Sequence, residues 1–459
     1  MPLIKNQIIP LTIDSLSNDG SGVGRFEGMA VFVPFTAVGD VLEVRIVKVC
    51  KSYAFGIIAR IVIPGADRIP AECAIFGKCG GCCFWHLSYA AELRAKQGFV
   101  ADAMQRIGGL ALPVREILPS PQPARYRNKV QYPLFCAEDG SVRTGFYASR
   151  SHRPVPCADC LLQPRLLNQI ADTVCTLLTK YKISVYDERT HRGLARHLYL
   201  RHAVTTGRVL VCLVCNGRRL PHAEEICAAL CAAHPEVESV VLNVNTKQTN
   251  VVTGAQCIPL HGPGVLRDTL RGVPVALDPL SFYQVNTEGA SRLYGVAAEL
   301  AALRPSDTLL DLYCGAGAIG LSMAAQCKRL IGVEIVPEAV ENARRSAAEM
   351  GFSHAEFLCA DAGEAAGKLA ADGLLPDIVI LDPPRKGCDA DTLDAVLRMA
   401  PRRVVMISCN PATAARDIQY LTARGYMAEA IQPVDLFPRT KHVECACLLV
   451  RSEQAVSAI

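Results

Sequence analysis

Hydrophobic and polar residues follow three different patterns along this chain, and each pattern predicts a different kind of unit. Residues 1–63 hold short runs rich in β-branched and aromatic residues, such as MAVFVPF and YAFGIIARIVI, with glycine-containing turns between them. Several short strands with frequent turns are typical of small barrels, and glycine supplies the backbone conformations that the turns need. We therefore expect an OB-like β-barrel over residues 1–63.

Residues 64–275 show a mixed pattern. The stretch LSYAAELRAKQGFVADAMQRIGG has helical periodicity and ends in two glycines, and HAEEICAALCAA is a second helical stretch. Apolar runs such as VLVCLVC and SVVLNVN lie on either side of that second helix and predict strands. The mixture predicts an α+β domain over residues 64–275.

From residue 276 to residue 459 strands and helices alternate regularly. TLLDLYCGAGAIGLSMAA predicts a strand, a glycine turn and a helix, and six further strands follow, of which RRVVMIS and HVECACLLVR are two. Alternation of this kind predicts a doubly wound, Rossmann-like α/β sheet. Such sheets bind their ligands at the carboxyl ends of the strands, so the residues that end each strand are the candidate site.

Composition narrows the class of protein. The chain has 459 residues, 50% of them hydrophobic, and a net charge of +4. The N-terminus lacks the charged and apolar regions of a signal peptide, and no apolar run is long enough to span a bilayer. We expect a cytoplasmic monomer without a membrane partner, and the mildly basic charge permits a nucleic-acid ligand.

Three of the 21 cysteines, Cys73, Cys79 and Cys82, have the spacing C-x5-C-x2-C around two glycines. In a large protein of a reducing compartment, such spacing indicates metal ligands rather than disulfides. A fourth ligand is missing locally, and the later pair Cys157 and Cys160 offers one. The spacing alone leaves zinc and an iron–sulfur cluster both open.

Two basic runs contain aromatic or imidazole rings. RYRNKVQYPLF (125–135) places arginine and lysine next to tyrosine, and ERTHRGLARHLYLRH (188–202) holds four arginines and three histidines. Cations that pair with phosphates and rings that stack on bases are what RNA contacts need. The alternative is that each run is a solvated face of a strand.

A glycine turn indicates a nucleoside cofactor. Asp311 ends a strand, Gly315 and Gly317 follow, and Glu334 ends the next strand, where a carboxylate can accept hydrogen bonds from ribose hydroxyls. The third glycine of the dinucleotide fingerprint is absent. The pattern therefore favours S-adenosylmethionine over NAD.

Three strand ends carry groups for methyl transfer to a base. Asp382-Pro383-Pro384-Arg385 ends one strand in a motif similar to that with which amino-methylating enzymes present a base, but Arg385 replaces the usual aromatic residue. Methylation of uracil C5 needs a thiolate that adds to C6 and a base that removes the C5 proton. Cys409 and Glu444 end and open two strands and can supply these groups. The alternatives are a packing cysteine and a salt-bridged glutamate at the rim.

With these motifs together, the chain resembles the uracil-C5 RNA methyltransferases, especially those that act on 23S ribosomal RNA. The resemblance covers nearly the whole length and is carried by CGGC, RYRNKVQYP, SFYQVN, DLYCGAGAIGL, DPPRKG, SCNPATAARD and HVE, in that order. It implies an N-terminal TRAM domain and a C-terminal class I methyltransferase domain. It also implies that a target uridine in ribosomal RNA leaves its stack to reach the enzyme.

The resemblance further implies the roles of individual residues. Cys409 is expected to be the nucleophile and Glu444 the base. S-adenosylmethionine is expected to bind to four residues: Gln284, Tyr313, Glu334 and Asp382. A [4Fe-4S] cluster is expected on four cysteines of the segment 73–160: Cys73, Cys79, Cys82 and Cys160. The stretch from Ser151-His152 to Gln163 favours Cys160 over Cys157.

Two other functions compete with methylation of ribosomal RNA. A transfer-RNA uracil-C5 methyltransferase is disfavoured because the transfer-RNA enzymes of this family generally lack both the barrel and the cluster motif. A non-catalytic iron–sulfur protein that binds RNA through a degenerate methyltransferase fold is disfavoured by the intact Cys409, Glu444 and Glu334.

Overall fold

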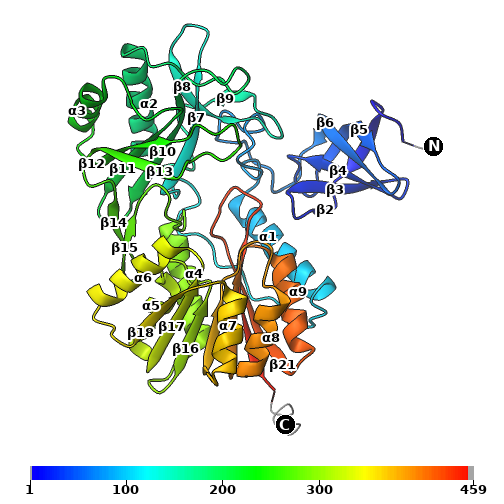
Figure 1. Cartoon of the computed structure of the whole chain (residues 1–459). Helices are drawn as coiled ribbons and strands as arrows, with labels where there is room; N and C mark the ends of the chain where they lie inside the picture. Colours follow the sequence, from blue (N-terminus) through cyan, green and yellow to red (C-terminus); the bar gives the residue numbers. More distant parts are fainter. Residues whose placement is uncertain (1–2, 453–459) are drawn as a thin grey trace.

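The computed structural model describes residues 3–452 and consists of three units (Figure 1). A barrel at the N-terminus stands apart from the larger body, which is built of a central unit and a C-terminal α/β unit. Within residues 3–452 no helix is both long and apolar enough to cross a membrane.

The N-terminal unit is one six-stranded sheet in the order β1-β5-β6-β4-β3-β2. Buried side chains alternate along β1, β3 and β4, so that one face of each strand fills a small apolar core. Its strands are β1 (Ile8–Thr12), β2 (Ser15–Leu16), β3 (Ser21–Phe26), β4 (Met29–Pro34), β5 (Val41–Val49) and β6 (Tyr53–Ile63).

The central unit is a seven-stranded sheet in the order β13-β12-β11-β10-β7-β8-β9, with two helices against it. Only β11 and β12 run parallel, and the other neighbours are antiparallel. Its elements are β7 (Lys129–Cys136), β8 (Val142–Tyr147), β9 (Pro154–Pro156), α2 (Arg165–Lys180), β10 (Ala195–Ala203), β11 (Arg208–Cys215), α3 (Ala223–Ala233), β12 (Val237–Val244) and β13 (Gln256–His261). A hairpin of β14 (Leu266–Leu270) and β15 (Val273–Leu277) leads on to the C-terminal unit.

The C-terminal unit is a second seven-stranded sheet, in the order β18-β17-β16-β19-β20-β22-β21. The first five strands in this order are parallel, and β22 runs antiparallel between β20 and β21. Its strands are β16 (Thr308–Leu312), β17 (Arg329–Glu334), β18 (Ala355–Cys359), β19 (Ile378–Leu381), β20 (Arg403–Ser408), β21 (Tyr426–Val434) and β22 (Glu444–Arg451).

Helices cover both faces of this sheet, because its central strands are buried on both sides. One apolar cluster joins the sheet to α4 (Thr287–Ala301), α5 (Ala318–Leu321) and α6 (Pro337–Glu349). A second joins it to α7 (Ala362–Ala371), α8 (Ala390–Met399) and α9 (Pro411–Thr422). A short 3₁₀ turn spans Ala324–Gln326.

Helix α1 (Tyr89–Arg106) belongs by sequence to the central region but packs on the C-terminal sheet. Its buried Val100 and Met104 lie in the same apolar cluster as α9. The backbone then follows β21, where Arg115 and Leu118 donate to the carbonyls of Ile431 and Pro433. The chain therefore contacts the C-terminal unit before it builds the central one.

The predicted barrel, α+β unit and doubly wound sheet are all observed. The sheet has the seven strands that the sequence indicates, and Cys409 follows β20 as expected.

Candidate active site

Four parallel strands deliver functional groups to the same edge of the C-terminal sheet. Tyr313 follows β16, Glu334 ends β17, Asp382 follows β19 and Cys409 follows β20. The carboxyl ends of parallel strands meet at one edge, so these side chains surround a common space. The parallel order of these strands thus brings together residues that the sequence predicts to bind the cofactor and to take part in the reaction.

The antiparallel strand β22 brings Glu444 to Cys409. In the pairing of β20 with β22, Ser408 lies opposite Cys445, and the next residues outward are Cys409 and Glu444. Cys409 is half-buried, whereas Glu444 is only 4% exposed. The thiol and the carboxyl group therefore lie next to each other where the strands end.

The SCNPATAARD stretch holds the neighbouring DPPR loop in place. Asn410 caps α9 by accepting from the Ala412 N–H at 3.2 Å, and its amide donates to the Arg385 carbonyl at 3.0 Å. Arg416 donates to the Lys386 carbonyl at 3.0 Å. The SCNPATAARD stretch therefore carries the thiol of Cys409 and also connects it to the DPPR loop.

Arg385 acts on both members of the pair. Burial raises the pKa of Glu444 to about 8, Asp382 adds to the shift, and the Arg385 guanidinium opposes it. Burial likewise raises the pKa of the Cys409 thiol, with a further contribution from Glu444, while Arg385 lowers it by its charge and by a hydrogen bond. The sequence indicated only that Arg385 replaces an aromatic residue, and its contact with Cys409 was not foreseen.

The glycine turn after β16 has the features of a nucleoside site. Glu334 accepts from the Gly315 N–H at 3.0 Å and from the Val336 N–H at 2.9 Å. Gly315 has a positive φ of 55°, and a Cβ there would meet no atom within 4 Å. Open space therefore lies directly beside the predicted ribose-binding carboxylate.

Two carboxyl groups at this edge of the sheet, those of Asp311 and Asp382, lack a positive partner among the residues that the structure describes. Asp311 accepts from the Gly320 N–H at 3.0 Å through Oδ2, whereas its buried Oδ1 has no partner within the described part of the chain. Burial raises the pKa of Asp311 to about 7, and burial also raises that of Asp382 to about 7. These residues lack a positive partner and fit a cationic cofactor such as a sulfonium compound.

Gln284 and Tyr313 complete the predicted cofactor residues. Gln284 lies before α4, and its side chain hydrogen-bonds the hydroxyl of Tyr294, which is buried near Asp382 and Glu444. Tyr313 has a positive φ of 65°, and its hydroxyl shares a hydrogen bond with Thr392 Oγ1 at 3.2 Å. No sequence signal distinguished Tyr294 from an ordinary core residue.

The predicted cluster cysteines meet around one small cavity. Its cysteine lining consists of Cys73, Cys79, Cys82, Cys157 and Cys160. A hydrogen bond from the Cys157 thiol and backbone N–H groups lower the pKa of Cys160 to about 7. Within residues 3–452 no three or more His, Cys, Asp or Glu side chains are placed to hold a single metal ion. The iron–sulfur cluster stays a prediction.

The two basic runs are only partly available to RNA. Arg125 forms a two-pronged ion pair with Asp159, at 2.5 and 2.7 Å, and Arg196 is buried against Glu188. Tyr126 and Tyr132, expected as stacking surfaces, are core residues. That part of the interpretation was wrong: Tyr132 packs into the core of the central unit from β7, and Tyr126, which precedes that strand, is buried with its hydroxyl donating to the Pro438 carbonyl at 3.0 Å.

Three neighbouring cations of these runs, and separately the exposed Arg192, form no ion pair in the part of the chain that the structure describes. The neighbouring three are Arg127, Lys129 and Arg201. Burial, with Arg201 and Arg127 close by, lowers the pKa of Lys129 to about 8. Asn128 between them donates to the Gln284 carbonyl at 2.8 Å, so this positive group adjoins the loop of the predicted cofactor site.

Comparison with known proteins identifies the family. Residues 276–452 match the family described as tRNA (Uracil-5-)-methyltransferase, and residues 3–59 match the TRAM domain. An RNA methyltransferase of Halalkalibacterium halodurans is 41% identical over 98% of both chains. The chain belongs to the RNA uracil-5-methyltransferase family. Another RNA methyltransferase, of Listeria monocytogenes serotype 4b, is 40% identical over 97% of this methyltransferase and 98% of that protein.

A solved structure shares the whole architecture of this methyltransferase. The tRNA (uracil-54, C5)-methyltransferase of Pyrococcus abyssi, in complex with S-adenosyl-L-homocysteine, has a TM-score of 0.77 at 27% identity. The match covers 96% of this chain and 99% of that one. A match of that extent includes the N-terminal barrel, so a tRNA enzyme carries the same barrel. The presence of the barrel therefore does not by itself separate a tRNA substrate from a ribosomal one.

Proposed function

We propose that this methyltransferase transfers a methyl group from S-adenosylmethionine to C5 of a uridine in RNA, with Cys409 as nucleophile and Glu444 as base. The observation that carries the proposal is the register of β20 and β22, which sets a thiol next to a buried carboxyl group at the carboxyl edge of the sheet.

The chemistry follows from the two side chains. The Cys409 thiolate forms a bond to C6 of the uracil, and the electron pair of the C5–C6 double bond moves toward O4, which makes C5 nucleophilic. Bound S-adenosylmethionine supplies an electrophilic methyl group. Glu444 then accepts the C5 proton, the double bond re-forms, and Cys409 leaves as thiolate. The raised pKa of Glu444 makes it a stronger base than an exposed glutamate.

The cofactor is proposed to bind Gln284, Tyr313, Glu334 and Asp382. The unpartnered Asp311 Oδ1 and the open space beside Gly315 support a cationic nucleoside there. The S-adenosyl-L-homocysteine in the Pyrococcus abyssi enzyme supports the same cofactor class.

The proposed substrate is 23S ribosomal RNA. The cysteine motif supports that assignment, whereas the full-length similarity to a tRNA (uracil-54, C5)-methyltransferase favours tRNA as the second candidate. In either case Arg127 and Lys129, which are only partly buried, are suited to bind phosphates beside the flipped uridine. Arg201 is 1% exposed and donates to the Tyr199 hydroxyl and the Ser281 carbonyl, so it supports this group from below.

Cys73, Cys79, Cys82 and Cys160 are proposed to hold a [4Fe-4S] cluster. Their convergence on one cavity supports this, and Cys157 is the neighbour that competes with Cys160. The cluster would fix the cysteine segment against the central unit, and no chemical step depends on it.

Covalent trapping tests the reaction and its substrate together. RNA in which 5-fluorouridine replaces uridine should form a stable adduct, because fluorine at C5 cannot be removed as a proton. We expect the adduct with 23S ribosomal RNA, and none with the Cys409→Ala variant. Adduct formation with tRNA alone would make tRNA the substrate and leave the mechanism intact. An equal yield of adduct from Cys409→Ala would exclude Cys409 as the nucleophile.

A further inference from the structure

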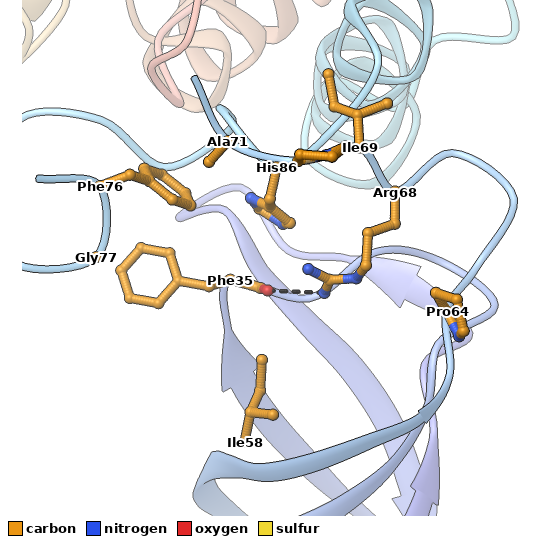
Figure 2. A pocket seen from close by; sticks show the side chains of 10 residues that line it. Phe35, Ile58, Pro64, Arg68, Ile69, Ala71, Phe76, Gly77 and His86 are labelled. Carbon is orange, nitrogen blue, oxygen red and sulfur yellow. Dashed lines mark hydrogen bonds between the residues drawn. The ribbon is translucent and has the colours of Figure 1, made fainter. Parts of the chain in front are cut away.

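A groove lies where the N-terminal barrel meets the cysteine segment, and none of the proposed catalytic residues lines it. Figure 2 shows Phe35 of the barrel turned toward Phe76 of the cysteine segment, with Ile58 on the barrel side and His86 close by. Its volume is about 640 Å³. Ligand sites for small molecules or single nucleotides commonly have roughly 300–1,000 Å³.

The walls of the groove are held firmly. Arg68 pairs with the buried Asp40 at 2.5 Å and donates to the Phe35 carbonyl at 2.9 Å. Asp40 also accepts from the Gly65 N–H at 2.9 Å, just after the end of β6. A small apolar core around Phe84 and other buried residues connects barrel and α1. The groove is therefore formed before any ligand arrives.

Phe35 is held in an unfavourable backbone conformation. Its φ is 61°, in the left-handed region that aromatic residues rarely adopt. The ring meets Phe76 edge to face at 5.1 Å, instead of entering the barrel core. Strained residues of this kind are frequent where a side chain is presented to a ligand.

His86 closes the groove behind Phe76 and is almost fully buried. The ring stacks on Phe76 with 5.4 Å between centroids, and Nε2 lies 3.0 Å from the Thr36 carbonyl. Burial lowers the pKa of His86 to about 4, so the ring is neutral and Nε2 carries the proton that it donates. Nδ1 is then an acceptor, and it has no partner in the part of the chain that the structure describes.

We propose that this groove is a second RNA site, which binds an unpaired nucleobase of the substrate by stacking on Phe35 and Phe76. This inference rests on one part of the proposed function, namely that the substrate is RNA. Aromatic rings on a preformed wall bind bases with little dependence on sequence.

The absence of an unpaired charge among the described residues of the groove suits an uncharged nucleobase rather than a phosphate. None of the described residues that line the groove is acidic, and its one cation, Arg68, is paired with Asp40. Exposed apolar side chains of β6, including Ile61 and Ile63, continue the surface. A base bound here would fix the RNA to the junction of two units, beyond the uridine at Cys409.

The test uses the full-length protein and a single-stranded RNA of about ten nucleotides that contains 2-aminopurine, whose fluorescence falls on stacking. We expect Phe35→Gly to bind this RNA at least about tenfold more weakly and to lose the quenching. Phe35→Gly also relieves the positive φ, so it should fold at least as well as the wild type. Phe35→Tyr should bind and quench like the wild type, because it keeps a flat ring.

The outcomes separate this site from the proposed catalysis. Binding by Phe35→Gly within twofold of the wild type would contradict the proposal and leave the groove for a protein partner. Loss of binding in both Phe35 variants would also contradict it, because the ring itself would then not matter. Trapping on 5-fluorouridine RNA at saturating concentration should be unchanged in Phe35→Gly. If the wild type formed no covalent adduct with 5-fluorouridine RNA, the proposed reaction would be contradicted, but the proposed base-binding groove would not.

Discussion

At the scale of single residues, the candidate site holds three carboxyl groups. That of Glu444 lies near the Arg385 guanidinium, whereas the other two lack a positive partner in the described part of the chain. Asp311 and Asp382 have a pKa raised to about 7, and Glu444 one raised to about 8, each mainly by burial. The free site is therefore partly protonated at neutral pH. A sulfonium ion would supply the missing positive charge and favour the ionised forms.

The affinity for S-adenosylmethionine should therefore rise with pH. Between pH 6 and pH 8 the carboxyls lose their protons, and the carboxylates attract the cation. We expect an increase of about tenfold for each pKa unit by which the cofactor lowers a carboxyl. Titration calorimetry at several pH values would measure it. S-adenosylhomocysteine is the control, because its neutral thioether should show a weaker dependence, and equal slopes would contradict the argument.

The same chemistry separates the roles of the catalytic pair. Glu444→Gln keeps the shape of the side chain but cannot accept the C5 proton, so the reaction should stop at the methylated adduct. We expect this variant to accumulate a covalent complex with ordinary, unfluorinated RNA, visible as a shifted band in a denaturing gel. A variant that turns over normally would exclude Glu444 as the base.

At the scale of elements, a buried ion network connects α1 to the loop before Glu444. Lys96 is fully buried, and its Nζ donates to Glu92 and to Asp435, both at 2.7 Å. The Arg439 N–H donates to Glu92 at 2.7 Å. Residues 435–443 form the connection between β21 and β22, so the network fixes the approach to Glu444.

Breaking this network should destabilise the C-terminal unit. Lys96→Met leaves the buried Asp435 without a cation. It leaves Glu92 with only Arg439, whose Nη1 lies 3.6 Å away. We expect a loss of about 3–5 kcal/mol in the free energy of unfolding. Urea denaturation would measure it. Arg94→Met, on the exposed side of the same helix, removes only a surface pair with Asp67 and should cost at most about 1 kcal/mol. Equal losses of stability in Lys96→Met and Arg94→Met would show that the buried network contributes no more than a surface ion pair.

At the scale of the whole molecule, the cysteine segment is where the units meet. Cys73, Cys79 and Cys82 precede α1, whereas Cys157 and Cys160 lie in the central unit, and all five line one cavity. Trp85 and Arg127 line it too, and Arg127 belongs to the positive group beside the cofactor loop. A cluster there would join the barrel segment, the central unit and the approach to the catalytic site.

Metal analysis would test this arrangement. Protein purified without oxygen should contain about four irons and be brown. Cys160→Ser should lose the iron, while Cys157→Ser should keep it. Cys136→Ser is the matched control, because that thiol is exposed and does not line the cavity. Stoichiometric zinc in place of iron would overturn the assignment.

The sequence by itself determined the elements and the candidate chemistry. Periodicity placed all seven strands of the C-terminal sheet, and strand ends pointed to Glu334, Asp382 and Cys409, because parallel strands share one carboxyl edge. Spacing likewise singled out Cys73, Cys79 and Cys82. Strand boundaries and cysteine spacings depend on residues that are close together in the chain, so a sequence pattern is enough to predict them.

Only the tertiary structure decided which of these groups meet. The strand order β20-β22-β21 sets Cys409 beside Glu444, and no pattern in the sequence fixes that order. The burial of a side chain depends on all of its neighbours in space, and for this reason the sequence did not show that Tyr126 is a core residue. The fold also brings the exposed Arg385 close to the thiol, and it leaves Phe35 only half-buried at the groove between the barrel and the cysteine segment.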